Sequence, residues 1–283
     1  MDSKEWFADW FDTSYYHTLY ANRNDAEAAE FISNLVHFLQ IDGNSSVLDL
    51  ACGKGRHSIT LNQLGYSVLG VDLSSNSIEA AKQYETENLK FAVHDMREVL
   101  VGQKFEAIFN LFTSFGYFDT LTENEKVVQS MHEMLGENGF LIIDFMNAQK
   151  VIDTLVRKES KTLDGITFEL ERLYDGSHIF KEIRFEDKGK NFHFTERVQA
   201  LKKEDFEQLL TANKFDSTIF HSQPCRTYSA TTPSASILTP KLICLKLFQR
   251  SSTFLSRNFN VVRFVLYDRD TSFLFWASTE STI

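Results

Sequence analysis

The sequence predicts an α/β fold: an open, mostly parallel β-sheet with helices on both faces and a small inserted antiparallel β subdomain. Over residues 45–146, short apolar runs alternate with stretches of helical periodicity, which is typical of parallel strands joined by right-handed crossovers. The apolar runs are nearly continuous, as in strands whose two faces are both covered. After residue 147 the pattern changes to short alternating stretches separated by turns, which indicates antiparallel strands.

Five apolar runs and the periodic stretches around them define the main domain. The predicted strands are residues 46–50, 66–71, 89–93, 105–112 and 140–145. The predicted helices are residues 25–40, 56–64, 76–85 and 123–135. Ser75 is the expected N-cap of the third helix, and Thr122 with Glu125 is the expected capping box of the fourth.

A small antiparallel meander is predicted between residues 161 and 199. Its alternating stretches are residues 167–173, 179–185 and 192–198, with Asp175-Gly176 and Lys188-Gly189 at the turns. A helix over residues 203–213 and a strand over residues 217–221 then return the chain to the main sheet.

The last sixty residues differ in composition from the rest of the chain. All three prolines lie at or after residue 224, no glycine follows residue 189, and residues 222–283 hold 18 Ser or Thr and a net charge of +4. Residues 242–248 are a candidate final strand, and residues 261–267 and 273–277 are expected to pair with each other. We interpret this segment as a frameshifted or read-through ending, with an extra domain as the alternative.

Composition argues against several classes of function. The chain carries 29 Lys and Arg against 39 Asp and Glu, a net charge of −10, which disfavours a broad nucleic-acid footprint. Three cysteines without a paired spacing suit a reducing compartment, and neither a signal peptide nor a membrane-spanning run is evident. We therefore expect a soluble cytoplasmic protein with no nucleic-acid or membrane partner. No metal is expected, because no spacing typical of a metal site occurs.

The first predicted strand ends in the pattern of a ligand-binding turn. Residues 47–58 read VLDLACGKGRHS, so Asp49 closes the strand and the small residues Ala51, Gly53 and Gly55 lead into a helix. Glycines let a ligand approach the backbone, and a helix N-terminus offers N–H groups that lack partners within the helix. In an open parallel sheet, this turn lies where ligands bind. A plain tight connection between strand and helix is the alternative.

Acids also close the second and third predicted strands. Asp72 follows Gly53 by 19 residues, a spacing that suits a carboxylate bound to the ribose hydroxyls of a nucleoside. Asp95 and Met96 follow the third strand, where an acid and an apolar side chain suit the amino group and the ring face of adenine. The alternative is that Asp72 and Asp95 cap the helix and the turn that follow them.

Together these strand ends resemble class I methyltransferases that use S-adenosylmethionine (SAM) and have a Rossmann-like fold. The turn at residues 49–55 is similar to the family's glycine-rich loop, with Asp72 at its ribose position and Asp95-Met96 at its adenine position. Residues 110–118 lie where the family opens its substrate cleft, and residues 135–144 resemble its turn into strand five.

The resemblance covers roughly residues 10–221 and has two departures. Ala51 stands where many relatives have their first glycine, a change that still permits close approach of a ligand. The chain after residue 221 does not match the family's usual ending.

The likeness is strongest to a bacterial subfamily of small-molecule and amino-sugar N-methyltransferases with a small β insertion after strand five. In such proteins an aromatic N-terminal segment covers the cofactor, and residues 15–23 resemble that lid. The alternative is that Tyr16 and Tyr20, four residues apart, form one buried face of a helix.

The resemblance implies SAM as cofactor, S-adenosylhomocysteine as product and a small-molecule methyl acceptor. The residues it implies at the cofactor are Tyr20, Arg23, Asp49, Ala51, Cys52, Gly53, Gly55, Asp72, Leu73, Asp95, Met96, Asn110 and Leu111. Methyl transfer from a sulfonium is an in-line displacement of an already activated group, so an obligatory catalytic base need not exist. Tyr16 and Thr113 are the catalytic candidates.

The predicted domain boundaries follow the changes of pattern. Residues 1–147 are the expected SAM-binding Rossmann-like domain, and residues 148–200 are the inserted antiparallel subdomain. Residues 201–248 return to the main domain, and residues 249–283 form an atypical C-terminal extension.

Two other functions stay open. An NAD(P)-dependent oxidoreductase also needs a glycine-rich turn and an acid after strand two, but Ser58 stands where the third glycine of GxGxxG is expected. A protein that binds SAM without turnover would keep the same cofactor residues. Among methyltransferases, a tRNA or protein acceptor is a further alternative. The acidic charge disfavours nucleic acid, and the lack of Asn-Pro-Pro-Tyr after strand four disfavours base N-methylation.

Overall fold

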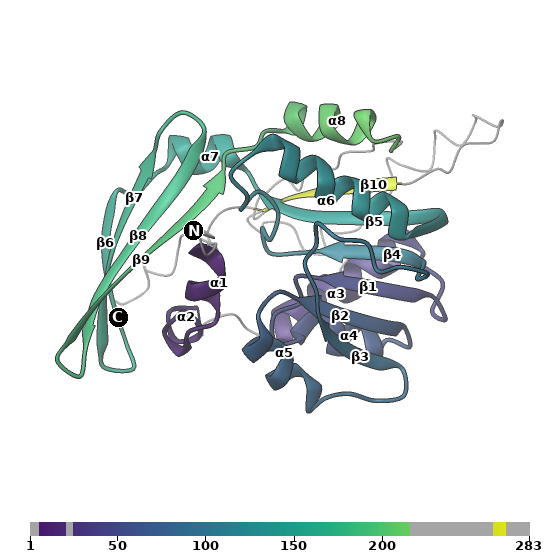
Figure 1. The fold of residues 1–283 in the computed structure, drawn as a ribbon, viewed down its shortest axis with the longest axis horizontal. Helices are drawn as coiled ribbons and strands as arrows, with labels where there is room; N and C mark the ends of the chain where they lie inside the picture. Colours follow the sequence, from purple (N-terminus) through teal and green to yellow (C-terminus); the bar gives the residue numbers. More distant parts are fainter. Residues whose placement is uncertain (1–5, 21–24, 216–262, 270–283) are drawn as a thin grey trace, which may run out of the picture.

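Two sheets make up most of the fold. The computed structural model describes residues 6–20, 25–215 and 263–269 of the 283-residue chain. A six-stranded sheet with helices on both faces lies beside a four-stranded sheet, and two short N-terminal helices lie between them (Figure 1). The expected α/β class with an inserted antiparallel sheet is confirmed.

The larger sheet is parallel and has the order β10-β5-β4-β1-β2-β3. Its strands are β1 (Ser46–Leu50), β2 (Ser67–Asp72), β3 (Leu89–Val93), β4 (Phe105–Asn110), β5 (Leu135–Met146) and β10 (Arg263–Arg269). From β1 the chain builds outward in one direction through β2 and β3, and then in the other through β4 and β5. The order therefore reverses between β1 and β4, which is where ligands bind in open α/β sheets.

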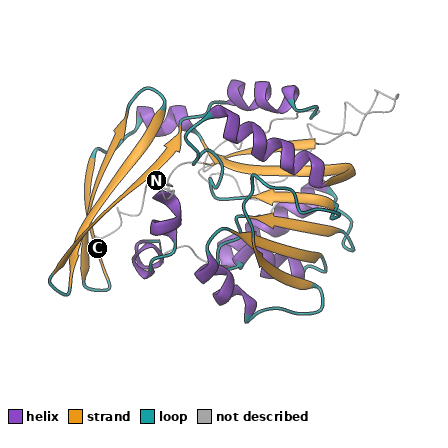
Figure 2. Cartoon of the chain, viewed as in Figure 1, coloured by secondary structure: helices purple, strands orange, loops and turns teal. Residues whose placement is uncertain are grey.

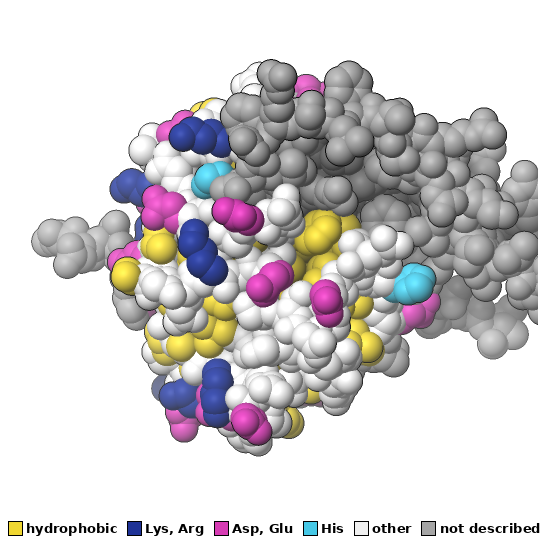
Figure 3. Space-filling view, turned by 90° about the vertical axis from the view of Figure 1, so that its right-hand side faces the viewer, with side chains coloured by type: hydrophobic (Ala, Val, Ile, Leu, Met, Phe, Trp, Pro, Cys, Tyr) yellow, Lys and Arg dark blue, Asp and Glu magenta, His cyan; other side chains and the backbone are white. Residues whose placement is uncertain are grey.

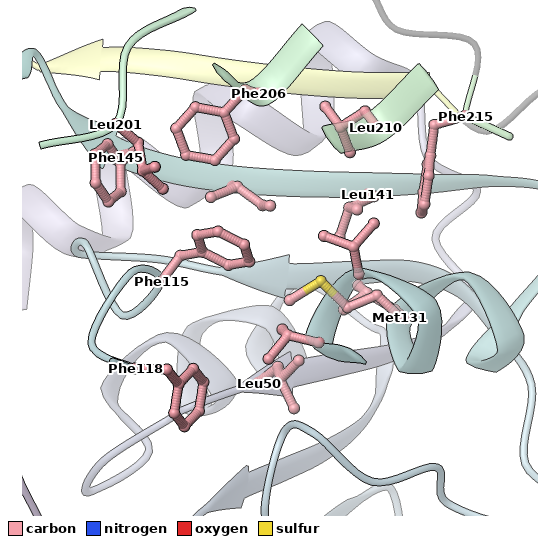
Figure 4. Close-up of a cluster of buried hydrophobic side chains, with 14 of the residues drawn as sticks. Leu50, Phe115, Phe118, Met131, Leu141, Phe145, Leu201, Phe206, Leu210 and Phe215 are labelled. Atoms are coloured by element: carbon pink, nitrogen blue, oxygen red, sulfur yellow. The ribbon is translucent and has the colours of Figure 1, made fainter. Parts of the chain in front are cut away.

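Helices cover both faces of this sheet, because successive side chains on each strand point to opposite sides. Leu48 packs into a core with Met131 of α6 (Leu121–Met134) and Phe206 of α8 (Lys203–Ala212), part of which Figure 4 shows. Val47, the preceding residue, packs into a second core on the other face. That core includes side chains of α3 (Asp25–Leu39), α4 (Arg56–Gln63) and α5 (Ser75–Lys82).

The smaller sheet is antiparallel and pairs neighbouring strands along the chain (Figure 2). Its strands are β6 (Lys158–Leu163), β7 (Ile166–Tyr174), β8 (His178–Asp187) and β9 (Lys190–Gln199), and α7 (Ala148–Asp153) leads into it. The N-terminal helices α1 (Trp6–Phe11) and α2 (Ser14–Leu19) pack on this sheet. Trp10, Leu19, Phe168 and Ile183 share a third hydrophobic core, separate from the two that flank the larger sheet.

Several boundaries differ from the sequence prediction. The capping box of α6 consists of Thr120 and Glu123, two residues before the expected pair, because Thr120 is the last extended residue (φ −127°). The N-cap of α5 is Ser74 rather than Ser75, because its hydroxyl accepts the N–H of Ser77 at 3.0 Å. Strand β6 was not predicted, since the half-buried face of this edge strand carries Glu159 and Lys161 and so lacks an apolar alternation.

Strand β10 overlaps the stretch 261–267 that was expected to pair with residues 273–277. It pairs in parallel with β5, from Arg263 opposite Phe140 to Arg269 opposite Met146, a partner that was not predicted. Pairing between segments so distant in sequence leaves no local signal. The predicted strands at 217–221, 242–248 and 273–277 lie outside the described residues, and the domain boundaries remain a prediction.

Two features of the described part bear on binding to nucleic acids and membranes, its surface charges and its helices. On the face in Figure 3, acidic and basic side chains are interspersed rather than gathered into a basic stripe of the kind that binds phosphates. Within the described ranges, no helix combines the length and apolar character that a membrane crossing requires.

Candidate functional site

A cavity of about 440 Å³ lies at the carboxyl ends of β1, β2 and β4. The loop after β1 contributes Cys52 and Gly53, β2 ends in Asp72, and the loop after β4 contributes Leu111. On the opposite side, the cavity is lined by side chains of α1, α2, β8 and β9. The helices α1 and α2, with Tyr20, therefore lie as a lid between the main sheet and the inserted sheet.

The turn after β1 has the backbone shape that the sequence pattern predicts. Ala51, Gly53 and Gly55 all have positive φ angles, of 66°, 55° and 82°. A Cβ at Gly53 would meet no atom within 4 Å, so this residue leaves open space beside the cavity. A Cβ on Gly55 would lie 2.6 Å from the ring of Phe91, so Gly55 is required for packing beneath the loop.

Asp49 lies beneath the loop rather than in the cavity lining. Its carboxylate is 1% exposed and accepts the hydroxyl of Ser58, at the start of α4, at 2.6 Å. Burial raises the pKa of Asp49 to about 6, against the opposing effect of the Ser58 hydrogen bond. Asp49 therefore links β1 to α4 and supports the loop from below.

Asp72 lines the cavity and joins two loops. One carboxylate oxygen accepts the N–H of Gly53 at 2.8 Å, and the other accepts the N–H of Ser74 at 2.8 Å. Burial raises the pKa of Asp72, and these backbone hydrogen bonds oppose the shift. Ser74 is the N-cap of α5, so Asp72 does not serve as the helix cap of the alternative interpretation.

Asp95 and Met96 also line the cavity, but the Asp95 carboxylate is already engaged. It accepts the backbone N–H of Arg97 at 2.9 Å, the Nε–H at 3.0 Å and an Nη2–H at 2.5 Å. Burial raises the pKa of Asp95, but the Arg97 hydrogen bonds outweigh it, so the pKa lies below its usual value. The turn cap of the alternative interpretation is thus present, and an adenine amino group would share this carboxylate with Arg97.

Arg97 connects the Asp95 side of the cavity to helix α6. Its Nη1 lies 3.1 Å from a Glu123 carboxylate oxygen, and its guanidinium stacks 4.5 Å above the ring of Phe118. Arg97 was not predicted as a site residue, although a cation two residues after an acid that follows a strand is a recognisable signal.

The loop after β4 has a strained backbone. Phe112 and Thr113 have successive positive φ angles of 59° and 56°, which non-glycine residues rarely adopt. Asp144 at the end of β5 holds both: its carboxylate accepts the N–H of Phe112 at 3.0 Å, and its carbonyl accepts that of Thr113 at 2.8 Å. Asp144 was missed as a site residue, although it lies near the carboxyl end of its strand, as Asp49 and Asp72 do in theirs.

The lid places two predicted site residues, Tyr16 and Tyr20, at the cavity. It also contacts the loop after β2 and the inserted sheet. Tyr16 and Tyr20 line the cavity with ring centroids 4.9 Å apart. Asp12 accepts the Ser74 hydroxyl and the Asn76 amide, each at 2.5 Å, and so joins the lid to the loop after β2. Tyr15 donates to Asp187 of the inserted sheet at 2.8 Å.

The inserted sheet contributes a charged pair that the sequence analysis missed. Lys181 on β8 and Glu196 on β9 are register partners and both line the cavity. The hydroxyl of Tyr20 lies between them, 2.6 Å from Lys181 Nζ and 2.7 Å from each Glu196 oxygen. One sequence signal could have revealed this pair. Lys181 is a charged residue at a position of β8 whose neighbours on the same face, Ile179 and Ile183, are apolar.

The structure brings most of the predicted site residues together. Those that line the cavity are Tyr16, Tyr20, Ala51, Cys52, Gly53, Asp72, Leu73, Asp95, Met96, Leu111 and Thr113. Asp49, Gly55 and Asn110 are not part of the lining; Asn110 is buried and donates to the Leu50 carbonyl at 2.9 Å. Arg23 lies outside the described residues.

Three histidines line the cavity, and the described part of the chain holds no cluster of metal ligands. His57 stacks on Phe112 with ring centroids 4.7 Å apart, and His17 and His94 also line the cavity. Among residues 6–20, 25–215 and 263–269, no three His, Cys, Asp or Glu side chains are grouped to hold a metal ion.

Comparisons with known proteins agree with this arrangement. A family model described as a methyltransferase domain matches residues 41–193, more than half of the chain. A curated relative from Streptomyces venezuelae, dTDP-3-amino-3,4,6-trideoxy-alpha-D-glucopyranose N,N-dimethyltransferase, is 26% identical over 211 residues, covering 70% of this chain and 86% of the relative.

Two solved structures share the fold. An S-adenosylmethionine-dependent methyltransferase from Clostridium acetobutylicum superposes with a TM-score of 0.60 and 22% identity, covering 71% of this chain and 84% of the other. The sugar N-methyltransferase KedS8 from Streptoalloteichus also has a TM-score of 0.60, with 24% identity over 70% of this chain and 83% of the other. At these identities the superpositions show the fold alone.

Proposed function

The chain belongs to the methyltransferase-domain family, and from that premise we propose that it transfers the methyl group of SAM to an amine nitrogen of a small molecule. The observation that carries the proposal is the cavity of about 440 Å³. At one end it is bordered by the strand-end loops of the parallel sheet, and at the other by the lid and the inserted sheet. Donor and acceptor thus have adjoining places in one cavity.

Family membership decides between the enzyme classes that the sequence left open. The chain is a SAM-dependent methyltransferase rather than an NAD(P)-dependent oxidoreductase. The residues that would hold the cofactor remain part of our proposal, as does the nature of the acceptor.

The loops after β1 and β2 fit an adenosine-containing cofactor. Gly53 leaves open space beside the cavity, and a side chain at this position would fill that space. Asp72 presents a carboxylate there, which suits the two ribose hydroxyls as donors. Asp95 and Met96 border the same space further along, where the amino group and the face of adenine would lie. When bound, SAM supplies a methyl group on a positively charged sulfur, which is already activated for transfer.

The protein's own part in the reaction is to align the two reactants and to exclude water. The lid covers the cavity with Phe11, Tyr16 and Tyr20, and these aromatic side chains keep the reacting groups out of bulk solvent. The loop held by Asp144 fixes Phe112 and Thr113 at the cavity edge in one conformation. Such alignment accounts for most of the rate gain available to a displacement of this kind.

The two catalytic candidates, Tyr16 and Thr113, differ in how exposed their side chains are at the cavity. Tyr16 belongs to the lid and is half-buried, so its side chain is placed to contact the acceptor. Thr113 is 3% exposed, so its role is better assigned to the strained loop backbone than to its hydroxyl. An obligatory base is not required, because a neutral amine is itself a competent nucleophile towards a sulfonium methyl group.

An amine acceptor is proposed because the relative from Streptomyces is named as an amino-sugar N,N-dimethyltransferase. The inserted sheet supports this choice, since it offers the carboxylate of Glu196 to the cavity. We would incubate the full chain with SAM and the dTDP-linked 3-amino sugar for which that relative is named, beside the matched 3-hydroxy sugar. Methylation of the amine alone, seen by mass spectrometry, supports the proposal. Methylation of the hydroxy sugar alone, or of neither while S-adenosylhomocysteine binds, contradicts it.

A further inference from the structure

The inserted sheet places a charged pair within an apolar face. On β8 the buried side chains are Ile179, Lys181, Ile183 and Phe185. On β9 the side chains opposite them are Val198, Glu196, Phe194 and Phe192. Removing a Lys–Glu pair from water is costly, and well-packed apolar residues would serve stability as well or better. The pair is therefore better explained by a role in the cavity it borders.

Both members of the pair line the cavity, and Glu196 is the more exposed of the two. Its side chain is 16% exposed, whereas that of Lys181 is 4% exposed. Two hydrogen-bond donors hold the carboxylate in place, the indole N–H of Trp10 at 2.6 Å and the hydroxyl of Tyr20 at 2.7 Å. Lys181 forms an ion pair with it, with Nζ 3.7 Å from a carboxylate oxygen. These contacts fix the position of the carboxylate at the cavity.

Aromatic rings surround the same end of the cavity. The ring of Phe11 lies 4.9 Å from that of Tyr16 and 5.4 Å from that of Tyr117, and the ring of Tyr16 lies 4.9 Å from that of Tyr20. Aromatic faces attract cations, most strongly where water is excluded. A carboxylate together with these rings forms an environment that favours positive charge.

We propose that the Glu196 carboxylate accepts an N–H of the acceptor amine and stabilises the positive charge that forms on its nitrogen. The inference rests on the proposed amine methylation. In the transfer step the nitrogen lone pair forms the new N–C bond, while the C–S bond breaks and its electrons return to sulfur. No proton moves in this step, and the positive charge passes from sulfur to nitrogen. A carboxylate beside nitrogen therefore interacts more strongly in the transition state than with the neutral amine.

A purely structural role for Glu196 makes a different prediction. Through Trp10 and Tyr20 the carboxylate also attaches the lid to the inserted sheet. If attachment were its only role, its loss would loosen the lid, and cofactor affinity would change together with turnover. Charge stabilisation on nitrogen would instead lower kcat while leaving the affinity for S-adenosylhomocysteine and the KM for the amine almost unchanged.

The test compares E196Q with E182Q in the full-length chain. Gln at 196 keeps the shape and an acceptor oxygen for Trp10 and Tyr20, but removes the charge. Glu182 follows Lys181 on the same strand but points to the other side of the sheet, where it contacts His193 and Thr195. E182Q therefore controls for the loss of a carboxylate from the inserted sheet.

With the amino sugar as acceptor, E196Q should lower kcat about 100-fold, the usual effect of removing one group that stabilises transition-state charge. The KM and the Kd for S-adenosylhomocysteine should stay within about threefold, and E182Q should resemble wild type. The N-methylated product is an ammonium ion. Its inhibition constant, taken relative to the KM for the amine, should therefore be higher for E196Q than for the wild type.

Two results would overturn the inference while leaving amine methylation intact. One is an E196Q enzyme with wild-type kcat. The other is a loss of turnover matched by an equal loss of affinity for S-adenosylhomocysteine, which would assign Glu196 to lid attachment. Failure of the wild-type chain to methylate the amine, although S-adenosylhomocysteine binds, would instead remove the proposed function and the inference together.

Discussion

The Asp72 carboxylate accepts the backbone N–H of Gly53 at 2.8 Å, across 19 residues of sequence. This hydrogen bond brings the ends of two neighbouring parallel strands to one edge of the cavity. A second bond from Asp72 to the N–H of Ser74 continues the link to the start of α5. Asp12 of the lid then contacts Ser74, so the lid and the loops after β1 and β2 form one connected network.

The packing of Gly55 against Phe91 can be tested by comparing two glycines. Gly55→Ala adds a Cβ that would lie 2.6 Å from the Phe91 ring, at a residue with φ +82°. Gly102→Ala shares the positive φ, at +79°, but its Cβ would meet no atom within 4 Å. We expect urea unfolding to show a loss of about 1 kcal/mol for Gly102→Ala, from backbone strain alone. Gly55→Ala should lose about 2–4 kcal/mol, since overpacking adds to the strain. Equal losses would show that the Phe91 contact is unimportant.

The raised pKa of Asp49 predicts a specific pH dependence of stability. Its value of about 6 in the folded protein exceeds the unfolded value of 3.8, so the folded state binds the proton more tightly. This contribution to stability is fully present below pH 4 and is lost as the pH rises through 6. Compared with Asp49→Asn, which does not titrate, the wild type should lose about 3 kcal/mol across that interval. The measurement is urea unfolding of both proteins from pH 4 to 7.5, and a constant difference between them would contradict the assignment.

The hydrogen bonds of Asp12 to Ser74 and Asn76 are expected to slow the dissociation of S-adenosylhomocysteine, because they hold the lid closed. Asp12→Ala removes the hydrogen bonds to Ser74 and Asn76, so the lid should open more often. We expect stopped-flow measurements to show S-adenosylhomocysteine dissociating about 3–10-fold faster, consistent with one or two partly exposed hydrogen bonds. Asp42→Ala, which removes an exposed acid in the loop before β1, is the control. Unchanged dissociation in Asp12→Ala would show that the lid is held by other contacts.

Much of the fold and the cofactor side of the cavity could be predicted from sequence, because their signals are local. Asp49 and Asp72 each stand near the end of a short apolar run, Gly53 follows the first of these runs, and parallel strands bring such ends to the same edge. The antiparallel subdomain was likewise visible in its alternation and its turn residues. The local N-caps were displaced by only one or two residues, because neighbouring Ser and Thr residues are chemically equivalent candidates.

The acceptor side of the cavity could not be predicted in the same way. Lys181 and Glu196 meet only through the register of β8 with β9, and Tyr20 reaches them from a helix about 160 residues earlier. Strand β6 lacks an apolar face, and β10 pairs with a strand more than a hundred residues away. These contacts depend on tertiary packing, which leaves no periodic trace in a single sequence.

The central claim is that the chain binds its cofactor through the loop after β1 and the carboxylate of Asp72. The most direct measurement is calorimetric titration of the wild type, Asp72→Ala and Asp42→Ala with S-adenosylhomocysteine. We predict one-to-one binding to the wild type and to Asp42→Ala with a Kd on the order of micromolar, roughly −8 kcal/mol, and a loss of at least about tenfold in Asp72→Ala. A folded wild-type protein that does not bind, or an Asp72→Ala variant that binds as tightly as the wild type, would contradict the account.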